Sequence, residues 1–167
     1  INDGSTDRTK QVLTELQKEV KHLIVYHQDN QGAAKSRNMG LSAMSDDIDA
    51  FMFLDADDQF LPGKMDQMIQ YYEKNEHLDI VIGQIGRGLN GDWKVIPTHE
   101  DIHREAIVSL AEAPEILQSI GPGGKLFKAK FNTLRFDEDV VFCEEHTFVT
   151  RAYLMARDIQ LVPFIVY

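Results

Sequence analysis

Cysteine is almost absent from this sequence, which contains only Cys143. A single cysteine excludes an internal disulfide and any zinc site built from cysteines, and it is compatible with a reducing compartment. The sequence also lacks an apolar run long enough to span a membrane, and no signal peptide opens it. Together these absences predict a cytoplasmic protein.

Basic residues are also in short supply. There are 17 Lys and Arg against 27 Asp and Glu, which gives a formal net charge of −10. A general nucleic-acid binder needs a basic face for the phosphates, so this balance disfavours a nucleic-acid partner. A phosphorylated small molecule remains compatible with it, because a metal ion and a few local basic residues can supply the positive charge.

The length and composition are those of one globular domain. The chain has 167 residues, of which 43% are hydrophobic and 26% charged, and no repeat or linker divides it. We therefore expect a single domain over residues 1–167. The sequence opens at Ile1 without an initiator Met, and we expect a fragment with a strand missing in front of it.

Strand-like and helix-like segments alternate along the chain, which predicts the α/β class with a mostly parallel central sheet flanked by helices. We expect strands at residues 1–4, 22–27, 50–54, 78–82 and 159–167. We expect helices at residues 5–20, 33–44, 62–72 and 144–157, with broken helical material at 101–117. Residues 83–97, which are rich in glycine, are compatible with a strand and loop or with a flexible excursion.

The most informative stretch is an apolar run, residues 51–54, that leads directly into Asp55, Asp57 and Asp58. The run has the composition of a strand buried on both faces, and ligands of open α/β sheets bind just past such strand ends. In extended backbone Asp55 and Asp57 would leave the same face. Paired carboxylates favour a Mg²⁺ or Mn²⁺ ion that bridges to substrate phosphates. The alternative is a solvated acidic turn.

Two other polar stretches carry weaker signals. Asp3 and Ser5 stand where a strand meets a helix start, whose free N–H groups favour phosphate. Taken alone, the stretch is better explained as an ordinary helix cap with a glycine turn. Lys35 and Arg37 lie near the start of another predicted helix, against the macrodipole preference, which favours anions there. A bound diphosphate would explain these cations, and a solvated basic face is the alternative.

Taken in order, these motifs resemble the family 2 glycosyltransferases of the GT-A fold. The motifs are Asp-Gly-Ser at residues 3–5, Asn-x-Gly-x-x-x-x-Arg-Asn-x-Gly at 30–40, and Phe-Leu-Asp-Ala-Asp-Asp at 53–58. The resemblance implies a single GT-A-type, Rossmann-like domain. Residues 1–83 would bind a nucleotide-diphosphate sugar, most simply a UDP-sugar, and residues 84–167 would form the acceptor side.

The resemblance also assigns roles on the donor side. It implies that Asp3, with Ser5 beside it, contacts the nucleobase, and that Arg37, with Lys35 nearby, contacts the base or diphosphate. Asp57 would bind the metal directly, and Asp55 would face the ribose or the metal. The ion would be Mn²⁺ or Mg²⁺.

On the acceptor side, Glu144 and Glu145 resemble the acidic pair that opens a helix in this family. The second member of the pair is the general base, which implies that Glu145 deprotonates the acceptor hydroxyl. The family usually has Glu-Asp, whereas this chain has Glu-Glu. Both carboxylates are also explained as partners of a helix N-terminus. By the same resemblance we place Lys125 near the phosphate or the acceptor. Trp93 is a ring that could stack on an acceptor sugar, and a half-buried structural Trp is the alternative.

The resulting hypothesis is a metal-dependent, inverting glycosyltransferase that builds a cell-surface polysaccharide or a teichoic-type polymer on a glycan or polymer acceptor. It would act in the cytoplasm, with peripheral association at the inner face of the membrane through regions outside this sequence. One alternative is a degenerate domain that binds a nucleotide sugar or a partner without turnover. Another is a Mg²⁺-dependent phosphohydrolase, but that class requires Thr or Val where Gln59 stands.

Overall fold

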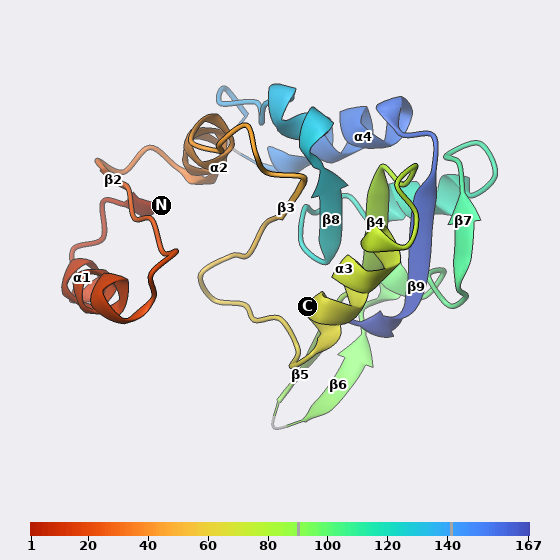
Figure 1. Ribbon diagram of the computed structural model, residues 1–167, viewed down its shortest axis with the longest axis horizontal. Coiled ribbons are helices and arrows are strands. Elements are labelled where there is room, and N and C mark those ends of the chain that lie inside the picture. The colour runs from red at the N-terminus through yellow and green to blue at the C-terminus, as the bar shows by residue number, and fades with distance from the viewer. Residues whose placement is uncertain (90, 141) are drawn as a thin grey trace.

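The computed structural model describes residues 1–89, 91–140 and 142–167, and it has the predicted α/β architecture (Figure 1). The central element is a five-stranded sheet with the order β3-β8-β4-β9-β7. Two smaller two-stranded sheets, β1-β2 and β5-β6, lie outside it. Helices and 3₁₀ turns connect these strands.

The N-terminal unit consists of β1 (Asn2–Asp3), α1 (Thr9–Glu19) and β2 (His27–Gln28). β1 and β2 pair in parallel, and the unit lies to one side of the large sheet (Figure 1). The predicted strand over residues 22–27 is wrong except at its last residue. Val12 and Leu16 of α1 and Val20 just after it are between 39% and 48% exposed, so this helix buries little apolar surface.

The large sheet is mixed, so the expectation of a mostly parallel sheet needs correction. Its strands are β3 (Ala50–Met52), β8 (Lys125–Lys128), β4 (Ile80–Gln84), β9 (Ile159–Ile165) and β7 (Ala106–Val108). Only β4 and β9 pair in parallel, and the other three neighbours pair antiparallel. The reason is β8, which comes from late in the chain and lies between β3 and β4, antiparallel to both.

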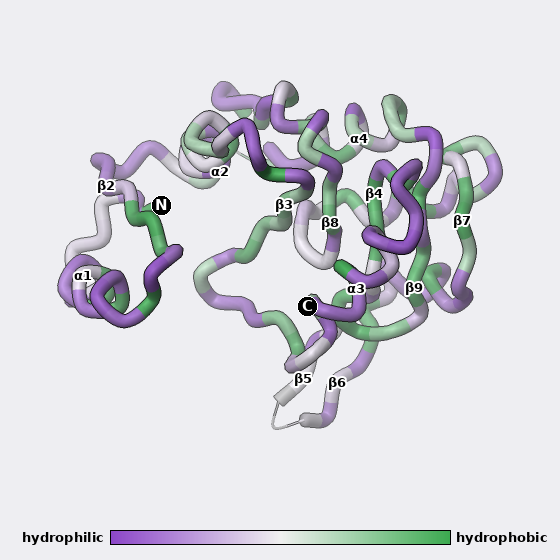
Figure 2. Tube along the Cα trace, in the orientation of Figure 1, coloured by the Kyte–Doolittle hydropathy of each residue, from purple (hydrophilic) through white to green (hydrophobic). Residues whose placement is uncertain are grey.

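Helices cover both faces of the sheet. Ile80 and Ile82 of β4 pack into the core under α4 (Glu145–Met155), whereas Val81 packs with Met68 of α3 (Lys64–Glu73) on the other face. This alternation follows from the two-residue period of a strand. Figure 2 shows the hydrophobic segments gathered along β4 and β8, with hydrophilic segments along the outer turns.

An aromatic cluster fills the core on the α4 side. Phe136 and Phe148 stack with their ring centroids 4.4 Å apart, and Phe53 meets both rings edge-on. Offset and edge-to-face arrangements are the favourable ones for such rings. The cluster joins the end of β3 to α4 and to the loop before it, and thereby positions two segments that carry acidic residues.

The second half of the chain differs most from expectation. The helical material predicted over residues 101–117 is wrong, because β7 pairs with β9 there and only a 3₁₀ turn, η2 (Pro114–Gln118), follows. Further 3₁₀ turns are η1 (Pro97–His99) and η3 (Ala129–Thr133). The glycine-rich stretch forms an antiparallel hairpin, β5 (Gly86–Leu89) and β6 (Asp92–Val95).

Candidate active site

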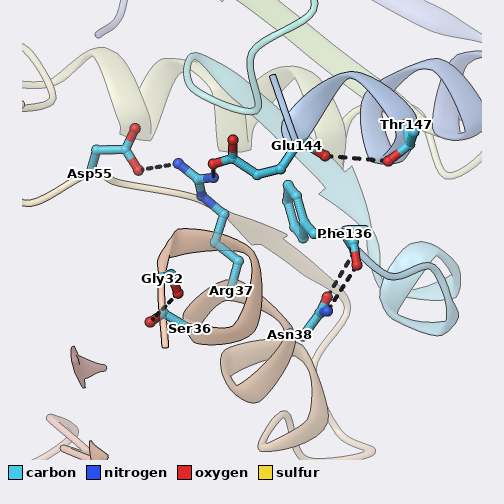
Figure 3. A network of polar contacts seen from close by, with 8 residues as sticks. All are labelled: Gly32, Ser36, Arg37, Asn38, Asp55, Phe136, Glu144 and Thr147. Carbon is cyan, nitrogen blue, oxygen red and sulfur yellow. Dashed lines mark hydrogen bonds and ion pairs between the residues drawn. The ribbon is translucent and has the colours of Figure 1, made fainter. Parts of the chain in front are cut away.

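One arginine joins three segments that are distant in sequence. The guanidinium of Arg37, on α2 (Ala33–Ser42), donates from Nη2 to Asp55 Oδ1 at 2.9 Å and from Nη1 to Glu144 Oε1 at 3.0 Å (Figure 3). The side chain of Arg37 is only 15% exposed, and that of Glu144 is 18% exposed. The network therefore brings the predicted donor-side and acceptor-side residues into one site.

The surroundings of Arg37 keep it charged and fixed in position. Its guanidinium carbon lies 5.3 Å from the centroid of the Phe136 ring, a cation–π contact. Burial lowers the pKa of Arg37, but the hydrogen bonds and charges of Asp55 and Glu144 outweigh it, so that the pKa is raised above its ordinary value. A guanidinium is planar and always charged, so it can donate to two carboxylates at once.

Asn38, the next residue, fixes the loop that carries Phe136. Its Nδ2 donates to the Phe136 carbonyl at 3.0 Å, and its Oδ1 accepts from the Phe136 N–H at 2.8 Å (Figure 3). Nδ2 also donates to Glu138 at 2.9 Å. Asn38 is buried, and its two bonds to Phe136 make it a positioning residue. It belongs to the Asn-x-Gly-x-x-x-x-Arg-Asn-x-Gly motif, but the motif alone did not indicate this role.

The acidic residues after β3 do not continue the strand. β3 ends at Met52, a turn follows at residues 56–57, and the Asp58 N–H bonds the Asp55 carbonyl at 3.2 Å. The prediction that Asp55 and Asp57 share one strand face is therefore wrong. The prediction that β3 is buried on both faces is also wrong, because β3 is the edge strand of its sheet and is only partly buried.

Asp57 and Trp93 line the same cavity, of about 420 Å³. It lies between the acidic loop and the β5-β6 hairpin, and Tyr167, Asp58 and Arg87 also line it. The Tyr167 hydroxyl accepts a hydrogen bond from the Asp55 N–H at 3.0 Å. Aromatic rings beside carboxylates can offer a sugar both a stacking face and hydrogen-bond acceptors.

Asp3 holds the turn in front of α2. Its carboxylate accepts hydrogen bonds from the backbone N–H groups of Gln31 and Gly32, both at 2.8 Å, and from the Gln28 side chain at 2.7 Å. Desolvation raises the pKa of Asp3, but these bonds outweigh it and hold the pKa below its ordinary value. Ser5 is exposed, and its N–H donates to Asn2 Oδ1.

Lys35 and Arg37 project to different sides of α2. Two residues along an α-helix turn by about 200°, so the two cations cannot reach one diphosphate from a single face. Lys35 lines a second cavity, of about 560 Å³, together with Arg135 and Glu138. The structure thus separates Lys35 from the network that contains Arg37.

Glu144 and Glu145 have different surroundings. Glu144 directly precedes α4, and its carboxylate binds Arg37 instead of capping the helix. The carboxylate of Glu145 makes no hydrogen bond or ion pair with the described residues. The backbone of Cys143, immediately before them, has a φ of 60°, which is rare for a residue other than glycine. Such strain is often found where a side chain must be aimed at a site.

Lys125 lies inside the protein instead of facing an acceptor. It is fully buried, and its ammonium donates to Ser119 Oγ at 2.7 Å and to the Gly121 carbonyl at 2.5 Å. Desolvation lowers its pKa to about 7. Its ammonium thereby holds the turn at residues 121–124, and the place of Lys125 near the acceptor stays a prediction.

The carboxylates present are compatible with a metal ion bound partly by substrate. No group of three or more His, Cys, Asp or Glu in the described part of the chain could hold a metal by itself. Mg²⁺ commonly takes one or two carboxylates and completes its shell with water and substrate phosphates. Asp57, which lines the aromatic-lined cavity of about 420 Å³, would supply such a carboxylate.

The fold and the site together define a glycosyltransferase-type domain of the GT-A fold. The profile described as Glycosyl transferase family 2 matches residues 1–146, and the chain belongs to this family. No helix in the described residues is long and apolar enough to cross a membrane.

Several known proteins are similar to this chain. TagX of Staphylococcus aureus strain N315, a glycosyltransferase by name, is 37% identical over 166 residues, which are 97% of this chain and 47% of TagX. A glycosyltransferase of Haemophilus influenzae is 32% identical over 165 residues, 89% of this chain and 48% of that protein. The chain thus spans about half the length of the curated relatives it matches.

Solved structures show the same fold. Residues 1–349 of S. aureus TarS superimpose with a TM-score of 0.83 at 23% identity, covering 99% of this chain and 48% of that one. The complex of TarS 1–349 with UDP superimposes with a TM-score of 0.82 at 22% identity, over 99% of this chain and 48% of that one.

Proposed function

We propose that this domain transfers a sugar from a nucleoside-diphosphate donor to a hydroxyl of a glycan or polymer acceptor, in the synthesis of a cell-surface polysaccharide or teichoic-type polymer. The observation that carries the proposal is the Arg37 network, which joins Asp55 of the donor side to Glu144 of the acceptor side. Uridine diphosphate is the proposed donor nucleotide, supported by the UDP complex of TarS.

The proposed chemistry is a single displacement with inversion. Glu145 takes the proton of the acceptor hydroxyl, since its carboxylate is the member of the acidic pair not occupied by Arg37. The acceptor oxygen forms a bond to the anomeric carbon as the bond from that carbon to the diphosphate oxygen breaks. Mn²⁺ or Mg²⁺ at Asp57, when bound, would stabilise the charge on the departing nucleoside diphosphate.

Calorimetry with a panel of nucleoside diphosphates, with and without Mn²⁺, tests this proposal. We expect Mn²⁺-dependent binding of UDP, and loss of that binding in Asp57→Asn, because this substitution removes the charge that holds the ion. Asp46→Asn changes an exposed aspartate outside the site and serves as the matched control. Equal UDP affinity in the wild type and Asp57→Asn would contradict the metal assignment.

A folded protein that binds none of the nucleotides would instead support the degenerate, non-catalytic reading. Binding of UDP without transfer to any acceptor would support a nucleotide-sugar sensor. The proposed enzyme requires both metal-dependent binding and release of UDP in the presence of acceptor.

A further inference from the structure

Lys125 is a lysine in the interior of the protein. Its side chain is 0% exposed, and no carboxylate in the described part of the chain lies within ion-pair distance of its ammonium. Burial of an unpaired charge is costly unless hydrogen bonds compensate it. The three N–H donors of the ammonium find three oxygens: Ser119 Oγ at 2.7 Å, the Gly121 carbonyl at 2.5 Å and, at 3.4 Å, the Gly123 carbonyl.

Two of these oxygens belong to the turn at residues 121–124, which supports the ring of Tyr167. A Cβ atom added at Gly123 would lie 2.9 Å from two carbon atoms of that ring, so the ring rests directly on the Gly123 backbone. The carbonyl of Gly124 accepts a hydrogen bond from the N–H of Gly83, in β4, at 2.9 Å. The turn is therefore held by Lys125 and by β4.

The Tyr167 ring in turn holds the acidic loop. Its hydroxyl accepts a hydrogen bond from the N–H of Asp55 at 3.0 Å, and Phe60 packs edge-on against the ring. Tyr167 and Asp57 also line the same cavity of about 420 Å³. A continuous series of contacts therefore runs from the Lys125 ammonium, through the turn and the Tyr167 ring, to the loop that carries Asp55 and Asp57.

The hydrogen-bond partners of Lys125 support a second part of the cavity wall. His99 Nε2 lies 2.8 Å from Ser119 Oγ, the oxygen that Lys125 also binds. The other ring nitrogen of His99, Nδ1, accepts a hydrogen bond from the N–H of Ile85 at 3.2 Å. Ile85 lines the cavity together with Tyr167. The polar cluster around Lys125 thus contacts two segments that form the cavity.

We propose that Lys125 is a positioning residue for nucleotide binding, which fixes the acidic loop through the turn at residues 121–124 and the Tyr167 ring. The proposal rests on the proposed transferase function and adds to it a residue that acts without touching the nucleotide. Asp57 needs such support because it lies in a turn and not in a strand. Packed side chains and hydrogen-bond networks can carry coupling of this kind.

A matched pair of lysine variants tests the role of the ammonium. Lys125→Met removes the buried ammonium and keeps a side chain of similar length. Lys128→Met, at the other end of β8, is the control, because its ammonium also donates to a backbone carbonyl, that of Glu76 at 2.7 Å, but away from the cavity. Each substitution is also made in a Tyr167→Phe background, which lacks the hydroxyl that binds the loop.

A matched pair of glycine variants tests the same path with Lys125 intact, and decides the question if Lys125→Met does not fold. Gly123→Ala places a methyl group against the Tyr167 ring and should displace it. Gly121→Ala adds the same methyl group to the same turn, where no atom lies within 4 Å of it, and serves as the control.

Two properties are measured on each folded protein: the affinity for UDP with Mn²⁺ by calorimetry, and the amide resonances of residues 55–61 by NMR. We expect Lys125→Met and Gly123→Ala to shift these resonances and to weaken UDP binding about three- to tenfold, and the controls to change it less than about twofold. In the Tyr167→Phe background Lys125→Met should cost less affinity, because the last hydrogen bond of the path is already absent. A purely structural role would lower the melting temperature without this dependence on Tyr167.

Two results would overturn the positioning role. UDP affinity equal to that of the wild type in Lys125→Met or in Gly123→Ala would leave the cluster a structural role only. An equal loss of affinity with and without the Tyr167 hydroxyl would show that Lys125 does not act through Tyr167. If the loop resonances shift as expected but the wild type does not bind UDP with Mn²⁺, the positioning of the loop stands and the proposed transferase function fails.

Discussion

At the scale of single residues, Glu144 and Glu145 differ in whether their carboxylate has a charged partner. Glu144 shares the Arg37 guanidinium with Asp55, and its charge is therefore compensated. Glu145 begins α4 with a carboxylate that has no partner among the described residues. A general base needs a lone pair directed at the substrate, so the uncompensated member is the better candidate.

Substitution of each glutamate by glutamine separates these roles. Glu145→Gln should retain UDP binding within about twofold and lose turnover by a factor of at least about 100, because general-base catalysis contributes about 10²–10⁴-fold. Glu144→Gln should lower the free energy of unfolding by about 1–3 kcal/mol, because it weakens a partly buried ion pair. Single-turnover rates and urea unfolding measure the two effects. If Glu145→Gln turns over like the wild type, Glu145 is not the base.

The sequence contained enough to identify the residues of the network but not their contacts. Local pattern selects Arg37 and Asp55, since a cation at a helix start and acids after a strand are locally unusual. Glu144 is selected by its resemblance to the acidic pair of the family. The Arg37 guanidinium can bind both carboxylates because Phe53, Phe136 and Phe148 pack together and bring their segments close. A single sequence does not indicate which residues more than a hundred positions apart, such as Arg37 and Glu144, are in contact.

At the scale of elements, the acidic loop is held by the end of the last strand. The N–H of Leu61 bonds the Val166 carbonyl at 2.8 Å, and the N–H of Asp55 bonds the Tyr167 hydroxyl. Phe60 also packs edge-on against the Tyr167 ring, 5.6 Å between centroids. The loop that carries Asp57 thus depends on β9 for its position.

Tyr167→Phe removes the hydroxyl and keeps the ring, so it tests the role of the hydroxyl alone. The ring contacts with Phe60 should persist, while the Asp55 N–H loses its acceptor, so the free energy of unfolding should fall by about 1 kcal/mol. We expect the affinity for UDP with Mn²⁺ to weaken several-fold, because the loop is less well placed. Tyr26→Phe, at an exposed tyrosine, is the control. Unchanged metal-dependent affinity in Tyr167→Phe would show that the hydroxyl does not position the loop.

Elements with strong local patterns were predicted well. The helices containing Arg37, Met68 and Phe148 and the strands at β4 and β9 lie within a few residues of their expected positions. The errors concern short strands such as β7, whose three residues gain their structure from pairing with β9 and not from their own propensity. Strand order and direction were equally inaccessible to local patterns.

At the scale of the whole molecule, a buried polar cluster lies in the interior of a strongly acidic protein. His99 Nε2 lies 2.8 Å from Ser119 Oγ, and Lys125 Nζ donates to the same oxygen. Burial, with the nearby charge of Lys125, lowers the pKa of His99 to about 3. The folded protein therefore keeps His99 neutral, and protonation of this ring opposes folding.

The cluster makes stability depend on pH with a definite sign. Below about pH 6.5 the unfolded chain binds a proton at His99 that the folded protein does not, so stability should fall as the pH drops from 6.5 toward 3, by up to about 1.4 kcal/mol per pH unit. Urea unfolding at several pH values should show a shallower slope for His99→Gln than for the wild type. His103→Gln, at an exposed histidine, should leave the slope unchanged. Equal slopes in all three proteins would contradict the assignment.

The position of β8 between β3 and β4 has a consequence for synthesis on the ribosome. β3 and β4 emerge early, but neither can take its place in the sheet until Lys128 has been made, and β4 gains its second partner only with β9. Until then the nascent chain presents unpaired strand edges, which are prone to association with other chains. We expect chaperone occupancy on the growing chain to persist until β9 has left the exit tunnel.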